Sequence, residues 1–147
     1  MGISLNGKRD RMRTMGRTQL GFTLIELLVT LAIIAILSTI AYASYREQVI
    51  KSRRSAATVC MQEAAQLTER FYSVNLSYQG APDPSCDATV SQFYAVTFAA
   101  APTARAFTIR AVPSSTRQND PKCGTLTLNQ QGVRTRSGTA AQVSDCW

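Results

Sequence analysis

The sequence predicts an α+β fold in which one long N-terminal helix packs on an antiparallel sheet of three or four strands. Three features predict it: an apolar run that contains a single acid, a helical period that continues beyond this run, and later segments that alternate between apolar and polar residues. With 147 residues, the chain has room for one domain and an anchor.

Residues 1–21 are basic and have no helical apolar period. They hold five bases and one acid, while the whole chain has a formal net charge of +7. A basic block directly before an apolar run stays on the cytoplasmic side of a membrane. We therefore expect residues 1–21 to be a leader that is removed. Met1, Met12 and Met15 all remain candidate start sites.

The apolar run extends over residues 22–45, and its only charged residue is Glu26. About 24 helical residues span roughly 36 Å, which is enough to cross a bilayer. A carboxylate in hydrocarbon costs about 3 kcal/mol unless a partner neutralises it. Cleavage between Gly21 and Phe22 creates an amine that can pair with the Glu26 of a neighbouring chain. We predict that Glu26 sets the stagger between chains during assembly.

The helical pattern continues beyond the apolar run to about Val74, before the helix breakers Gly80, Pro82 and Pro84. Arg53 interrupts the apolar stripe, which contains Val49, Ala56, Cys60, Ala64, Leu67, Phe71 and Val74. The charged residues expected to surround this stripe are Arg46, Glu47, Lys51, Arg54, Glu63 and Glu69. One amphipathic half of the helix should therefore lie on the core of a globular domain, residues 46–147.

The remaining segments read as strands. Residues 93–100 and 106–113 alternate and are rich in β-branched and aromatic residues, and residues 124–138 indicate two strands around a turn near Asn129–Gly132.

The composition argues against an enzyme. The chain has no His, which removes the commonest general base and the commonest transition-metal ligand. No C-x-x-C pair and no phosphate-binding glycine loop is present after the leader. We expect no catalytic residue, no metal and no cofactor.

The segment GFTLIELLVTLAIIAIL resembles the N-terminus of type IV pilins. The resemblance implies that a prepilin peptidase cleaves after Gly21 and N-methylates Phe22, and that Glu26 and Thr23 belong to the assembly motif. The segment starting at Cys60, the CGTLTLNQQGVRT hairpin and the final DCW resemble the minor pilins called PilE. The implied fold is the pilin fold.

The resemblance also implies partners and location. The partners would be other pilin subunits, the peptidase, the inner-membrane assembly platform and the inner membrane itself. A single-pass inner-membrane protein with a cytoplasmic leader would become part of an extracellular pilus, serving pilus biogenesis, twitching motility, adhesion or DNA uptake. The alternatives are a major pilin, a type II secretion pseudopilin, or a pilus-associated DNA receptor.

The sequence departs from many pilins at two positions of the long helix. Ala35 and Ala43 stand where those pilins often have Gly and Pro. Ala raises helix stability by about 1 kcal/mol over Gly and about 3 kcal/mol over Pro. We therefore predict a more continuous and straighter helix in this chain.

Four cysteines allow three disulfide pairings. We favour Cys60–Cys86, which ties the connecting loop to the helix, and Cys123–Cys146, which closes the surface loop that pilin families display.

DNA is a further candidate partner, through a basic strip on the sheet. Arg134 and Arg136 are two residues apart on an expected strand and should share a face. If Arg110 or Lys122 joins them, the strip can hold DNA phosphates.

Overall fold

The computed structural model describes residues 21–147, so the expected leader and its candidate start sites lie outside the described residues. The elements follow in the order α1 (Leu24–Asn75), α2 (Ala88–Ser91), β1 (Tyr94–Phe98), β2 (Thr108–Pro113), β3 (Leu126–Asn129), β4 (Arg134–Arg136) and the 3-10 helix η1 (Val143–Asp145). The chain divides into two compact parts, the second of which is Ile40–Trp147. The short elements α2 and η1 had no sequence prediction.

Helix α1 is helical at every residue from Leu24 to Asn75, including Ala35 and Ala43. The predicted continuity is therefore confirmed, whereas the predicted straightness stays a prediction. The N-terminal part of α1 is long and apolar enough to cross a membrane, and none of that stretch is buried within the chain. Its large apolar side chains thus lack cover within residues 21–147.

The buried face of α1 is rotated from the predicted stripe. The buried residues of this helix are Arg54, Ala57, Thr58, Cys60, Met61, Ala64 and Thr68. Cys60 and Ala64 were predicted correctly. Leu67 and Val74 were not, because 62% and 78% of their surfaces are exposed, and Ala56 is exposed too.

Hydroxyl groups explain part of the rotation. Thr58 donates to the carbonyl of Ser55 and Thr68 to the carbonyl of Ala64, each at 2.8 Å. Such side chains satisfy their own polar atoms within the helix and can therefore be buried. Thr58 and Thr68 can therefore lie on the core beside Ala57, Met61 and Ala64.

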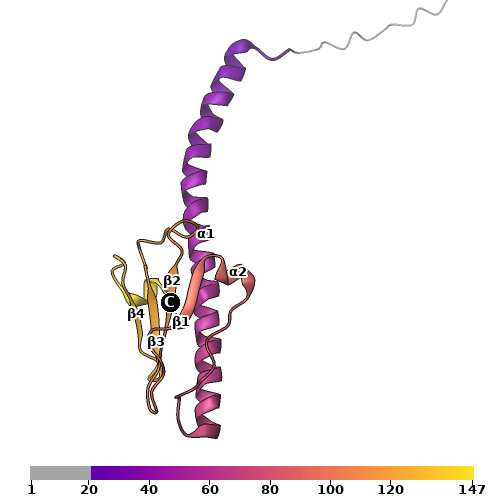
Figure 1. Cartoon of the computed structure of the whole chain (residues 1–147). Helices are drawn as coiled ribbons and strands as arrows, with labels where there is room; N and C mark the ends of the chain where they lie inside the picture. The colour runs from indigo at the N-terminus through magenta and orange to yellow at the C-terminus, as the bar shows by residue number, and fades with distance from the viewer. Residues whose placement is uncertain (1–20) are drawn as a thin grey trace, which may run out of the picture. The chain divides into compact units, whose positions relative to one another are not determined.

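The four strands form one antiparallel sheet in the order β1-β2-β3-β4 (Figure 1). Each strand falls inside a segment that the sequence predicted, and Gly132, with φ of +75°, turns the chain between β3 and β4. Alternate residues of β1 are buried, as expected for a sheet with one covered face. The α+β fold class is confirmed.

Side chains from α1 and from the covered face of the sheet form one core. Met61 of the helix and Ile109 and Leu126 of the sheet have no exposed surface. A cluster of three aromatic side chains belongs to this core or packs against it. Tyr78 stacks on Tyr72 with ring centroids 4.4 Å apart and contacts Phe107 edge-on with centroids 5.0 Å apart.

Two disulfides join the loops to this core. Cys60 of α1 is bonded to Cys86 in the loop before α2, and Cys123 is bonded to Cys146 next to the C-terminus. These are the pairs that the sequence favoured. They close loops with sequence separations of 26 and 23 residues, each contributing roughly 3 kcal/mol in the chain-entropy account.

Candidate assembly site and candidate nucleic-acid interface

The residues of the N-terminal motif lie at the start of α1. The backbone N–H of Glu26 donates to the hydroxyl of Thr23 at 3.2 Å, and the N–H of Leu27 donates to the carbonyl of Thr23 at 3.2 Å. Thr23 thus caps the helix, a role that the T-x-x-E spacing of a capping box could have indicated from sequence.

Glu26 lies in the first turn of α1, where a carboxylate is favoured by the helix dipole. Its side chain is exposed, and neither of the two ion pairs within residues 21–147 involves it. Phe22 is 79% exposed, and Gly21 has open space around its α-carbon. The motif is accessible, and its acid has no cationic partner among the described residues.

A buried polar network ties the loop before β3 to α1. Arg54 Nη1 and the Tyr94 hydroxyl each donate to Asp120 Oδ2 at 2.8 Å, and the N–H of Cys123 donates to Asp120 Oδ1 at 3.2 Å. Gln118 Nε2 donates to the carbonyl of Ile50 at 3.1 Å. The network was not predicted, because Arg54 was expected on the polar face of the helix.

This network changes the pKa of one of its members, Tyr94. Burial raises the pKa of the Tyr94 hydroxyl, and its hydrogen bond to the Asp120 carboxylate raises it further. The hydroxyl therefore stays protonated and remains a donor to Asp120. The network is structural in character, since its charged groups are turned toward one another inside the fold.

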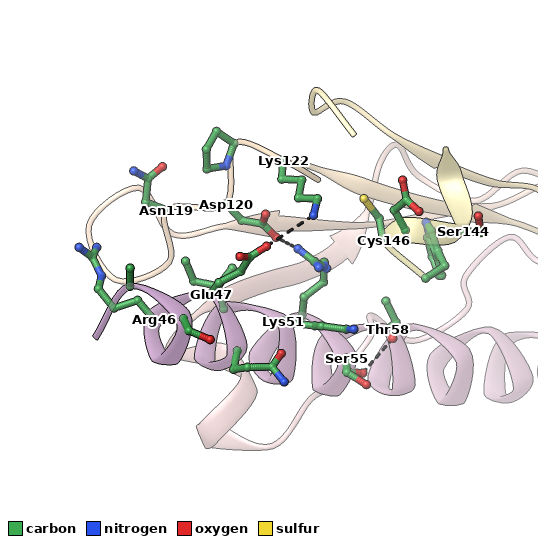
Figure 2. Close-up of a pocket in the computed structure, with 18 of the residues that line it drawn as sticks. Arg46, Glu47, Lys51, Ser55, Thr58, Asn119, Asp120, Lys122, Ser144 and Cys146 are labelled. Carbon is green, nitrogen blue, oxygen red and sulfur yellow. Dashed lines mark hydrogen bonds and ion pairs between the residues drawn. The ribbon is translucent and has the colours of Figure 1, made fainter. Parts of the chain in front are cut away.

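A groove of about 1090 Å³ opens beside this network. Figure 2 places Arg46, Glu47 and Lys51 of α1 on one wall, with Asp120 and Lys122 facing them. Lys122 Nζ lies 3.5 Å from Glu47 Oε1, and both side chains are largely exposed. The C-terminal residues Ser144, Asp145, Cys146 and Trp147 complete the lining. Charges of both signs therefore line the groove.

The candidate DNA residues do not form one strip. Arg134 is paired in register with Leu128, and Arg136 with Leu126, so both arginines project on the helix-facing side of the sheet at its edge. Arg110 is paired with Thr97 and Thr127 on the opposite, solvent-facing side. The hypothesis that Arg110 joins Arg134 and Arg136 is therefore wrong, because the sheet separates them.

Lys122 is connected to this edge only through the groove that it shares with Trp147. The guanidinium of Arg134 is 5.2 Å from the ring centroid of Trp147, and Trp147 lines the groove together with Lys122. Arg136 is already engaged, since its guanidinium donates to the carbonyls of Gly138 and Gln142. Arg134 is exposed and makes no ion pair within residues 21–147, whereas Lys122 is exposed but paired with Glu47.

Sequence reasoning missed Trp147 as a member of this surface. Its indole Nε1 donates to the carbonyl of Thr135 on β4 at 3.1 Å. The only available signal was that it is the single Trp of the chain and follows a cysteine directly. Within residues 21–147, no group of three or more potential ligands from His, Cys, Asp and Glu could hold a metal ion.

Comparison with known proteins decides the family. Residues 43–127 match the family model described as "Type IV minor pilin ComP, DNA uptake sequence receptor", which covers more than half of the chain. The chain belongs to the type IV minor pilins. Residues 16–42 of this minor pilin match the prokaryotic N-terminal methylation motif. The apolar helix and this motif are consistent with membrane anchoring and with a place in a pilus.

Solved pilin structures agree with this assignment. A type IV pilin from Shewanella oneidensis is 32% identical over 67% of this minor pilin and 97% of its own chain, with a TM-score of 0.52. The non-core minor pilin PilV from Neisseria meningitidis shares the fold, with 22% identity, 65% and 94% coverage and a TM-score of 0.53. A search of the curated proteins found no match.

The predicted pilin family is therefore confirmed. The matching family model is that of ComP, so the finer resemblance to PilE stays a prediction. Family membership indicates that this minor pilin associates with other pilin subunits in a pilus.

Proposed function

We propose that this minor pilin is cleaved after Gly21, N-methylated on Phe22 and assembled into a type IV pilus, or primes its assembly. The observation that carries the proposal is the exposure of the N-terminal part of α1. The large apolar side chains from Phe22 to Leu37 are between 50% and 79% exposed. Such a surface requires lipid before assembly and neighbouring helices afterwards.

Glu26 is proposed as the docking group between subunits. An ionised carboxylate among apolar side chains costs about 3 kcal/mol in hydrocarbon, and pairing with the Phe22 amine of a neighbouring subunit offsets that cost. Capping by Thr23 and the helix dipole also favour an acid here, so the test has to separate charge from capping.

Intact mass and N-terminal sequencing of the protein from membranes, with and without the peptidase, test the processing step. The expected mature chain starts at N-methyl-Phe22 and is absent without the peptidase. A chain that keeps its leader in both strains would contradict the proposed processing.

Glu26→Gln tests docking, because Gln keeps the capping geometry while it removes the charge. We expect Glu26→Gln to be cleaved and yet to be lost from sheared filaments, with Thr23→Ser as the matched control that keeps the cap. Normal incorporation of Glu26→Gln would remove the docking role. Immunoblotting of the same filaments measures stoichiometry, where a dominant band would indicate a major subunit.

The topology follows from the same proposal. The leader is cytoplasmic, the globular part is periplasmic and later extracellular, and the assembly platform of the inner membrane is a partner. The proposed role is structural, with no catalytic residue assigned. Pilus biogenesis, twitching motility, adhesion and DNA uptake are the processes that such a subunit serves.

DNA binding is a second candidate function, favoured by the match to a family whose description names a DNA uptake sequence receptor. The cations that support it are Arg134, stacked against Trp147, and Lys122 across the C-terminal segment. Phosphate contacts by such side chains give an affinity that falls as salt rises. Glu47 and Asp145 in the same groove weaken this attraction.

Fluorescence anisotropy of a labelled duplex with the full chain in detergent tests this function. We expect Arg134→Ala with Lys122→Ala to reduce affinity and to flatten the salt dependence. Arg105→Ala with Arg110→Ala is the matched control, because it removes the same charge from exposed positions and Arg110 lies on the opposite side of the sheet. An equal loss in both variants, or an affinity independent of salt, would count against a specific interface.

A further inference from the structure

A second, smaller pocket of about 270 Å³ is lined by three arginines and no carboxylate. Arg46 and Arg53 come from α1, and Arg117 comes from the loop that follows β2. Tyr45, Thr116 and Asn119 add neutral polar groups to the lining. This arginine pocket shares Arg46, Ile50 and Asn119 with the larger groove, but its own lining contains no acid, whereas the groove carries charges of both signs.

The structure fixes one of the three arginines. The guanidinium of Arg53 lies 3.7 Å from the ring centroid of Phe93, and its Nη1 donates to the carbonyl of Arg117 at 3.3 Å. Arg46 and Arg117 are exposed. The central cation is thus held in place by the fold, with two further cations on the rim.

None of these three arginines makes an ion pair within the described part of the chain. The two ion pairs within residues 21–147 use Arg54 with Asp120 and Lys122 with Glu47. Three guanidiniums without ion pairs around one small pocket favour a multiply hydrogen-bonded oxyanion, and phosphate matches the guanidinium fork.

The position of the pocket along the chain indicates the source of the phosphate. Arg46 is the first charged residue after the apolar run, and Tyr45 ends that run and lines the pocket. Tyrosine is enriched at membrane interfaces, where its ring and hydroxyl meet lipid and water. Arg53 follows Arg46 by seven helical steps, or about 10 Å, so Arg46 is the cation of this pocket that lies nearest to the apolar run along α1.

We propose that the arginine pocket binds the phosphate of an anionic phospholipid headgroup while the protein is anchored in the membrane. The inference rests on the membrane anchoring in the proposed function. Basic residues are disfavoured next to a membrane segment on its translocated side, so three of them around one pocket require a specific reason. Duplex DNA is the less favoured occupant, because the pocket is small and adjoins the apolar run.

Native mass spectrometry of the full chain in detergent tests the proposal, with phosphatidylglycerol and phosphatidylcholine of identical acyl chains as probes. We expect the wild type to retain phosphatidylglycerol on the order of tenfold better than phosphatidylcholine. Arg46→Ala with Arg117→Ala should abolish this preference without unfolding the protein, because both side chains are exposed. Arg105→Ala with Arg110→Ala removes the same charge from exposed positions outside the pocket and should keep the preference.

Several results would overturn the proposal. Equal retention of both lipids, or equal loss in both double variants, would mean that no specific lipid site exists. Displacement of phosphatidylglycerol by millimolar inorganic phosphate would indicate a free-anion site instead. Displacement by a short duplex, together with loss of duplex binding in Arg46→Ala with Arg117→Ala, would assign the pocket to DNA. Leader processing and filament incorporation are measured in separate experiments. A negative result for lipid binding therefore does not count against the proposed role as a pilin.

Discussion

Arg54 Nη1 lies 2.8 Å from Asp120 Oδ2, and both side chains are almost completely buried. The pair joins α1 to the loop before β3 across 66 residues of sequence. Buried pairs of this kind are costly to break, because the remaining charge has no water to solvate it.

Removing one partner of this pair should destabilise the globular part strongly. We expect Asp120→Ala to lower the free energy of unfolding by about 3–5 kcal/mol, because Arg54 and Tyr94 lose their shared acceptor. Chemical denaturation of the full chain in detergent measures it. The exposed pair Lys122–Glu47 is the control, and Glu47→Ala should change stability by less than about 1 kcal/mol. Equal effects would mean that burial does not set the strength of the pair.

The rotated face of α1 gives a second test on one helix. Met61 has no exposed surface, whereas Leu67 is 62% exposed. We expect Met61→Ala to cost about 2–5 kcal/mol through the cavity that it leaves, and Leu67→Ala to change stability by less than about 1 kcal/mol. Thermal unfolding followed by circular dichroism compares the two. A larger loss of stability for Leu67→Ala than for Met61→Ala would show that the apolar stripe predicted from sequence is the face that packs on the core.

Tyr78 should titrate far above an ordinary tyrosine. Burial, together with the hydrogen bonds of 2.9 and 3.0 Å to the Glu69 carboxylate and the charge of that carboxylate, raises the pKa of Tyr78 to about 12. A raised pKa means that the folded state holds the proton more tightly than the unfolded state. The associated stability is complete below pH 10 and is lost as the pH rises from 10 toward 12.

Tyrosinate absorbance during an alkaline titration measures this shift. The difference between wild type and Tyr78→Phe should isolate one transition near pH 12, and the variant should lose less stability between pH 10 and 12. A difference transition near pH 10 would show that Tyr78 is not shielded from solvent.

Gly138 should tolerate no side chain. A β-carbon at this position would collide with the backbone of Lys122 and Cys123, which cannot move aside as a flexible side chain would. We expect Gly138→Ala to destabilise the C-terminal loop by about 1–3 kcal/mol. Gly132→Ala is a useful comparison, because its cost arises from a φ of +75° in otherwise open space. Limited proteolysis near the Cys123–Cys146 loop distinguishes a local from a global effect.

The sequence predicted those parts of the fold that depend on local pattern. Apolar length and alternation located α1 and the four strands to within a few residues. Such patterns do not predict the register of the sheet, and a shift of one residue decides whether Arg110 lies on the same face of the sheet as Arg134 or on the opposite face. Arg54 was misplaced because its partner Asp120 is distant in the chain, and only the pairing makes its burial tolerable.

Trp147 has a consequence for the sheet as a whole. β4 is an edge strand, and edge strands with free backbone groups recruit strands from other molecules. The indole of Trp147 bonds the carbonyl of Thr135, and the disulfide to Cys123 fixes the adjacent Cys146. The C-terminal segment therefore covers part of the β4 edge and disfavours edge-to-edge pairing with the sheet of another molecule. Such pairing is a risk for any subunit that is packed closely against its neighbours in a filament.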